Sequence, residues 1–135
     1  MSEYSDIILA YSKQSPNNFK MENPTISHNE ESRVCWDTIE VFLKISDDNS
    51  IKDFSFIWNT SIITKAAASI LWESIIWEDI DKLLDYNLEY IKDLIWEVSP
   101  RRKHAATLWL LATRNAIHKY KNDDIYDDFT DVLEY

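Results

Sequence analysis

The 135-residue chain contains no glycine, whereas an average composition of roughly 7% would give about 9 such residues. Glycine is the residue that adopts positive φ without steric cost and lets the backbone approach a ligand closely. A P-loop or a dinucleotide-binding loop is therefore excluded, because both depend on glycines. Tryptophan, in contrast, occurs six times, at Trp36, Trp58, Trp72, Trp77, Trp96 and Trp109.

Cysteine, long apolar runs and positive charge are also scarce. Cys35 is the single cysteine, so no disulfide can form within the chain, which fits a reducing compartment. No apolar run is long enough to cross a membrane, and the first residues lack a secretory signal pattern. Fourteen Lys and Arg face 24 Asp and Glu, giving a net charge of -10, which argues against nucleic-acid binding. We therefore expect a soluble cytoplasmic protein that binds neither nucleic acid nor membrane.

The first half of the chain has a β pattern. After a short apolar helical stripe in residues 4–12, residues 13–33 are polar and are expected to form a long loop. Residues 38–45 alternate between apolar and polar, which is typical of a half-buried strand. Residues 51–58 repeat this alternation after the turn-forming residues 47–50, so the two segments predict a hairpin.

The second half has a helical pattern. We expect a helix over 61–76, one or two amphipathic helices over 78–95, and a last helix from Ser99-Pro100 to about Tyr120. A hairpin followed by helices predicts an α+β fold, a small antiparallel β-sheet with helices packed on one face. The chain is expected to form a single domain over residues 1–121, followed by an acidic, frayed tail over 122–135.

Several polar groups stand at the predicted ends of these elements. Cys35 and Asp37 precede the first strand, and His104 follows basic residues in the first turn of the last helix. Thiolate, carboxylate and imidazole are all ligands for zinc or iron. A single cysteine is more often a small buried hydrophobe, however, and a histidine in a first helical turn is more often solvated. His28 and His118 have no evident companions in the sequence.

Three stretches carry a resemblance to a known family. Cys35-Trp36-Asp37 is similar to a Cys-Gly-Asp motif, WNTSIITKAAAS (58–69) to a stretch that holds a second cysteine, and KHAATL (103–108) to one that holds a third. From about Tyr4 to Tyr120 the chain thus resembles the iron–sulfur cluster assembly scaffolds of the IscU, SufU and NifU N-terminal domain type. The resemblance implies their SufE/NifU-like fold and places Ser61 and Ala105 where the second and third cysteines belong.

The resemblance also implies a diverged ligand site. A [2Fe–2S] cluster needs about four ligands, mostly thiolates, and neither serine nor alanine replaces one. Cys35, Asp37 and His104 are therefore expected to bind iron or zinc, or Cys35 to accept sulfur from a cysteine desulfurase, in a protein that is not itself an enzyme. Two alternatives remain open: a non-catalytic adaptor that binds a desulfurase or another partner, and a homodimer that pools Cys35 from two chains around one cluster.

The tryptophans form a second hypothesis. Trp36 stands at the glycine of the Cys-Gly-Asp motif, and Trp58, Trp77 and Trp96 stand where strands or helices end. UGA is read as glycine in some bacterial genetic codes and as tryptophan in others. Several or all of the six tryptophans are therefore hypothesised to be glycines natively. The alternative is a genuine glycine-free chain, and UGG codons at these positions would establish it.

Overall fold

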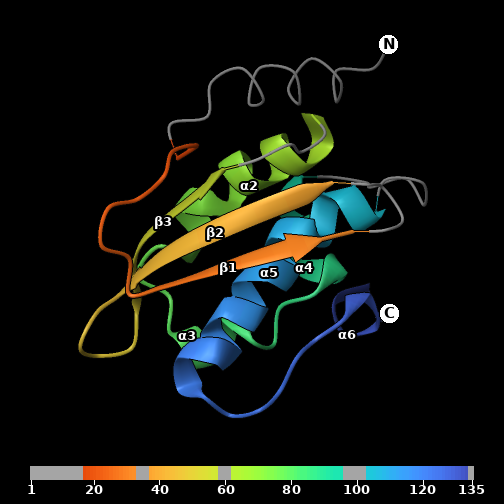
Figure 1. The fold of residues 1–135 in the computed structure, drawn as a ribbon. Helices are drawn as coiled ribbons and strands as arrows, with labels where there is room; N and C mark the ends of the chain where they lie inside the picture. Colours follow the sequence, from red (N-terminus) through yellow and green to blue (C-terminus); the bar gives the residue numbers. More distant parts are fainter. Residues whose placement is uncertain (1–16, 33–36, 58–61, 96–102, 134–135) are drawn as a thin grey trace.

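The computed structural model describes residues 17–32, 37–57, 62–95 and 103–133. Three strands form an antiparallel sheet in the order β1-β2-β3: β1 (Ile26–Glu31), β2 (Thr38–Ile45) and β3 (Ile51–Ile57). The helices are α2 (Ile62–Ile75), α3 (Ile80–Leu83), α4 (Leu88–Ile95), α5 (Lys103–Lys121) and α6 (Phe129–Leu133). Figure 1 shows the sheet as one layer with α2 and α5 packed behind it, so the predicted α+β class is confirmed.

The predicted hairpin is confirmed almost to the residue. Val41 of β2 faces Phe56 of β3, and Leu43 faces Phe54. All four side chains are buried on the face that meets the helices. The alternating pattern predicted this face because successive side chains of a strand point to opposite sides of a sheet. A shift of register between Lys44 and Ile45 lets Ile45 pair with Ile51 just before the turn.

The expectation of one long loop over residues 13–33 is wrong for its second half. β1 pairs there with β2, from Ile26 opposite Leu43 to Glu31 opposite Thr38. Its sequence, ISHNEE, lacks the apolar alternation that reveals a half-buried strand. The strand forms at the sheet edge because β2 offers it a backbone ladder, and α5 supplies polar partners: Asn115 donates to the Glu30 side chain and Lys119 to the Ser27 carbonyl.

Helix α5 is the centre of the molecule. It contacts β1, β2, α2, α4 and α6, and most of its side chains from Ala105 to His118 are buried. Helix α2 packs through small side chains, since Ala66, Ala67 and Ala68 are all buried. The predicted region 78–95 contains two helices, α3 and α4. The cap predicted at Ser99-Pro100 and the helix predicted over 4–12 lie outside the described residues. No helix in the described ranges is long and apolar enough to cross a membrane.

The end of α2 is closed by an unusual residue. Trp77 has a φ of 67°, and its side chain is 62% exposed. The other positive-φ residues of the described chain are three asparagines and one aspartate, which tolerate this conformation. Hydrogen bonds on both sides fix the backbone here, from the Trp77 amide to the Ile51 carbonyl (2.6 Å) and from the Ile51 amide to the Glu78 carbonyl (2.9 Å). This is the backbone position at which helices most often place glycine.

Trp109 occupies a different environment. It is fully buried between α5 and the sheet, with its ring edge-on to Phe54 at a centroid distance of 6.1 Å. A glycine at position 109 would leave a void of indole size in the core. The Trp109 indole N–H nevertheless has no hydrogen-bond partner within the described ranges. The local geometry therefore supports glycine at position 77 and opposes it at 109, while the hypothesis about the codons stays untested.

The tail is not frayed as expected. After α5 the chain turns back along the helix, and Val132 and Leu133 of α6 join the hydrophobic core. Asp128 accepts the Thr130 amide (2.9 Å), and its own amide donates to Asp131 (2.8 Å), which caps α6. Composition alone predicted a solvated acidic segment, but two apolar residues at its end are enough to dock it. We call residues 122–133 the strap.

Candidate functional site

The sheet register brings two predicted site segments to the same end of the molecule. Glu31, the last residue of β1, pairs with Thr38, the first of β2, so the connection that contains Cys35 joins them there. Ile57, the last residue of β3, pairs with Glu40, so the connection that contains Ser61 leaves from the same end. Cys35 and Ser61 themselves lie outside the described residues, as do Arg101 and Arg102.

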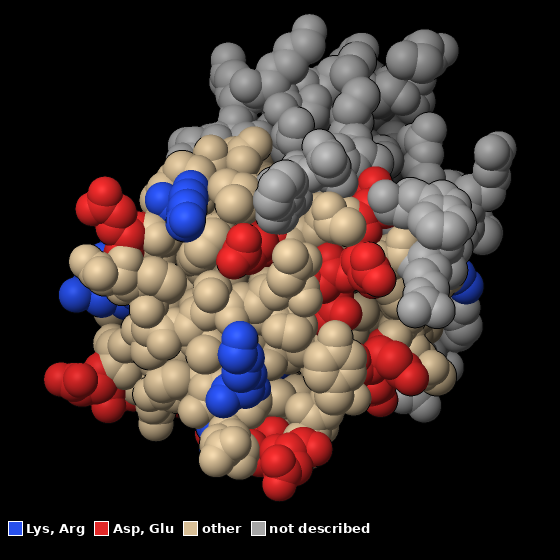
Figure 2. Space-filling model, viewed as in Figure 1, with Lys and Arg blue, Asp and Glu red and all other residues tan. Residues whose placement is uncertain are grey.

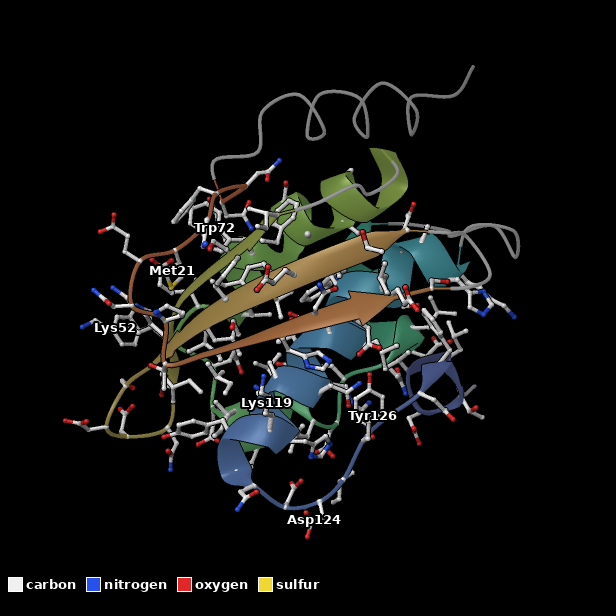
Figure 3. The ribbon with its side chains drawn as sticks, in the orientation of Figure 1. Met21, Lys52, Trp72, Lys119, Asp124 and Tyr126 are labelled. Carbon is white, nitrogen blue, oxygen red and sulfur yellow. The ribbon has the colours of Figure 1, made fainter. Side chains whose placement is uncertain are left out.

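Helix α5 points its first turn toward this end. Lys119, near the end of α5, donates to the Ser27 carbonyl (2.9 Å), and Asn115 donates to Glu30 (2.8 Å). Figure 3 shows Lys119 on this last part of the helix, close to the start of β1. The helix therefore runs antiparallel to β1, and its first turn, with His104, lies toward the end at which β1 stops.

Asp37 is a buried residue rather than a surface carboxylate. Only 7% of it is exposed, and its carbonyl accepts the Ser32 amide at 2.9 Å, which closes the connection between β1 and β2. Asp37 lies immediately before β2, two residues after the candidate cysteine in the sequence.

His104 is half-buried in the first turn of α5. Its ring stands edge-on to Phe129 of α6 with 4.7 Å between centroids. Burial, and secondly the charge of Lys103, lower the pKa of His104 below its ordinary value. This lower pKa favours the neutral imidazole, whose nitrogen lone pair a metal ligand or a proton acceptor needs.

Ala105 cannot act as a metal ligand. It is buried, with 6% exposed, at the position that the family resemblance assigns to a cysteine. Its methyl group offers no ligand. Within the described ranges no group of three or more His, Cys, Asp or Glu side chains is arranged to hold a metal ion. The single cysteine of the sequence also cannot supply the several thiolates that a [2Fe–2S] cluster needs.

Sequence reasoning missed a polar network beside this site. Glu30 accepts hydrogen bonds from Asn115 (2.8 Å) and Tyr126 (2.7 Å), and its carboxylate lies 3.0 Å from His28. Asn115 also forms two hydrogen bonds with the backbone of Asp127. Its side-chain amide donates to the Asp127 carbonyl (3.0 Å), and its side-chain oxygen accepts from the Asp127 amide (2.7 Å). The network joins β1, α5 and the strap.

Both histidines that the sequence left without companions belong to this network, so that expectation is wrong. His118 contacts Asp123 through Nδ1 (2.8 Å) and Asp127 through Nε2 (3.0 Å). Arg114 donates to Asp127 (2.8 Å) and to the Tyr86 carbonyl (2.8 Å). A usable signal was the polar set Arg114, Asn115 and His118 within the mostly apolar stretch of α5 from Ala105 to His118.

The fold and the site together define a small α+β domain with one cysteine-bearing connection at the end of its sheet. A sequence profile of the NifU-like N-terminal domain matches residues 3–126. The chain belongs to the NifU-like N-terminal domain family.

Named relatives agree with this assignment. The chain is 30% identical over 80 residues to the iron–sulfur cluster assembly scaffold protein IscU of Thermotoga maritima; the match covers 59% of this chain and 56% of that protein. It superposes on the N-terminal part of a NifU-like protein from Brucella abortus with a TM-score of 0.70 and 18% identity, over 88% of this chain and 94% of that one. A protein from Fervidobacterium islandicum, described as an iron–sulfur cluster assembly scaffold for the SUF system, gives a TM-score of 0.70 at 20% identity, over 87% and 96%. At these identities the two structures support the fold alone.

Proposed function

We propose that this protein works in cytoplasmic iron–sulfur cluster assembly as a diverged scaffold-type protein that accepts sulfur on Cys35. Support comes from family membership and from one geometric observation: Asp37 and His104 lie toward the sheet end whose connection contains the single cysteine. The role is stoichiometric rather than enzymatic.

The proposed step conserves atoms and electrons. The thiolate of Cys35 attacks the outer sulfur of a persulfide on a cysteine desulfurase. A sulfur–sulfur bond forms on Cys35 as the donor's sulfur–sulfur bond breaks, and the donor cysteine leaves as a thiolate. The proton lost by Cys35 can pass through neutral His104 to that thiolate.

The test is persulfide labelling of the purified protein with the source organism's cysteine desulfurase and L-cysteine. We expect intact-mass analysis to show the gain of one sulfur atom per chain, lost in Cys35→Ala and slowed in His104→Gln. Lys52→Gln, an exposed residue of β3, serves as the matched surface control and should label like the wild type. A wild-type protein that stays unlabelled would overturn sulfur acceptance.

A second candidate function is the binding of one iron or zinc ion by Cys35, Asp37 and His104. The neutral imidazole of His104 favours it, because a metal ligand must be deprotonated. After anaerobic loading with ferrous iron or zinc, metal content should fall in Cys35→Ala, Asp37→Ala and His104→Gln alike. Equal metal content in all four proteins would exclude this site.

The adaptor alternative predicts a different pattern. The protein would bind a cysteine desulfurase with equal affinity in wild type and in Cys35→Ala, while neither labelling nor metal content depended on the cysteine. Measuring binding, labelling and metal content on the same two proteins separates the three roles.

A further inference from the structure

A hollow opens on the surface between β1 and the strap. It has a volume of about 400 Å³ and is lined by Glu30 and Glu31 of β1, Leu111 of α5, and residues 126–129. We call it the β1–α6 hollow. Leu111 and the rings of Tyr126 and Phe129 make its walls apolar, and carboxylates surround them.

The hollow has an excess of negative charge. Glu30 and Asp127 are held from inside by Asn115, Arg114 and Tyr126. Glu31 and Asp128 are exposed, and in the described part of the chain no Lys or Arg forms an ion pair with either. Figure 2 shows acidic side chains gathered over the end of β1 and beside α6 on this face.

The aromatic wall is held in place before any ligand arrives. Tyr126 is 64% exposed, yet its hydroxyl donates to the buried Glu30 at 2.7 Å, and its ring stands edge-on to His28 at 5.9 Å. Its neighbour Ile125 is 53% exposed. Figure 3 shows Tyr126 on the strap, facing outward beside α5. An exposed aromatic ring that is already fixed loses little conformational entropy on binding, which is typical of interface anchors.

The chemistry of the hollow selects its occupant. An acidic rim around aromatic and aliphatic walls suits a cation with an apolar stem, and arginine fits better than lysine because guanidinium pairs with carboxylates in a plane and stacks on rings. A second copy of this chain is disfavoured, since each copy has a net charge of -10. Nucleic acid is disfavoured for the same reason.

We propose that the β1–α6 hollow docks a segment of a partner protein in which an arginine stands between apolar residues. The arginine pairs with Glu31 and Asp128 and lies against Tyr126, and its apolar neighbours cover Ile125 and Phe129. Phe129 lines the hollow and also contacts His104, so the bound partner sits beside the candidate site. This surface is independent of whether Cys35 accepts sulfur.

The test uses a capped Leu-Arg-Leu peptide and its neutral match, Leu-citrulline-Leu, followed by amide NMR shifts of the full chain. We expect saturable shifts at Glu31 and at residues 125–129 with the arginine peptide only. The double variant Glu31→Gln and Asp128→Asn should weaken binding by about tenfold, and asparagine at 128 can keep the cap of α6.

The control is a double variant, Glu22→Gln and Glu73→Gln, which removes the same charge from exposed residues elsewhere. It should bind the arginine peptide as the wild type does. Equal binding of both peptides, equal weakening in both double variants, shifts that map elsewhere, or no saturable shift up to about 10 mM peptide would each overturn the proposal.

Discussion

Glu30 is a buried carboxylate of the edge strand β1 that contacts both α5 and the strap. Burial by itself raises its pKa, but the hydrogen bonds from His28, Asn115 and Tyr126, with the charge of His28, outweigh burial and leave the pKa below its ordinary value. Its ionised form is therefore more stable in the folded chain than in the unfolded one. Tyr126 responds in the opposite sense: burial, then its hydrogen bond to Glu30, raise the pKa of Tyr126 to about 12.

We expect Glu30→Gln to lower the free energy of unfolding by about 1–3 kcal/mol at pH 7. The folded pKa lies below the unfolded value of about 4.3, so this stabilisation is present above that pH and is lost as the pH falls through the folded pKa. Urea unfolding at pH 7 and at lower pH should show the gap between the two proteins closing. The control variant Glu31→Gln changes an exposed neighbour and should alter the free energy of unfolding by less than about 0.5 kcal/mol. A difference between wild type and Glu30→Gln that does not depend on pH would contradict this account.

The segment that ends helix α2 has a left-handed backbone at Trp77, a conformation that tryptophan adopts only at a steric cost. The paired backbone of Ile51 and Glu78 holds Trp77 in the left-handed region, and the exposed indole gains little from packing. A residue other than glycine loses roughly 1–2 kcal/mol in that region.

We expect Trp77→Gly to raise the free energy of unfolding by about 1 kcal/mol, because glycine removes that steric cost. Trp109→Gly is the matched contrast and should lower it by at least about 3–5 kcal/mol, since it empties the core. Thermal and urea unfolding of the two variants measure both effects. A destabilising Trp77→Gly would show that the left-handed backbone is not costly here.

The strap is held against the domain by Val132 and Leu133, which are part of the hydrophobic core. We expect Val132→Ala to destabilise the protein by about 1–2 kcal/mol, because Val132 is fully buried in the core. Thr130→Ala, an exposed change in the same short helix, should cost less than about 0.5 kcal/mol. If amide hydrogen exchange in α6 is already rapid in the wild type and both changes are neutral, the strap does not dock.

At the scale of the whole molecule, the connections that contain Cys35 and Ser61 leave the same end of the sheet, and of these two residues only Cys35 is a thiol. We expect anaerobic reconstitution with ferrous iron and sulfide to give no stable [2Fe–2S] spectrum in the wild type, because Ser61 and Ala105 cannot replace thiolates. The combined variant Ser61→Cys and Ala105→Cys should gain visible cluster absorption. Each single change should give less, and a wild type that binds a full cluster would point instead to Cys35 shared between two chains.

Local pattern was sufficient for part of this architecture. The alternation of residues 38–45 predicts β2 and its buried face because strand periodicity is a property of neighbouring residues. The candidate ligand types at Cys35, Asp37 and His104 are also legible without a fold. β1 was not predictable in this way, since its polar sequence becomes a strand only when β2 and α5 lie beside it.

Residue identity and short-range period were sufficient to predict the α+β class, the hairpin and the helical stripes, and they show that Ser61 and Ala105 are not cysteines. The tertiary structure decided the rest. Glu30 meets Asn115 across 85 residues and Tyr126 across 96, and such pairs have no local signature. The docked strap, the β1–α6 hollow and the left-handed backbone at Trp77 all arise from contacts between segments that only folding brings together.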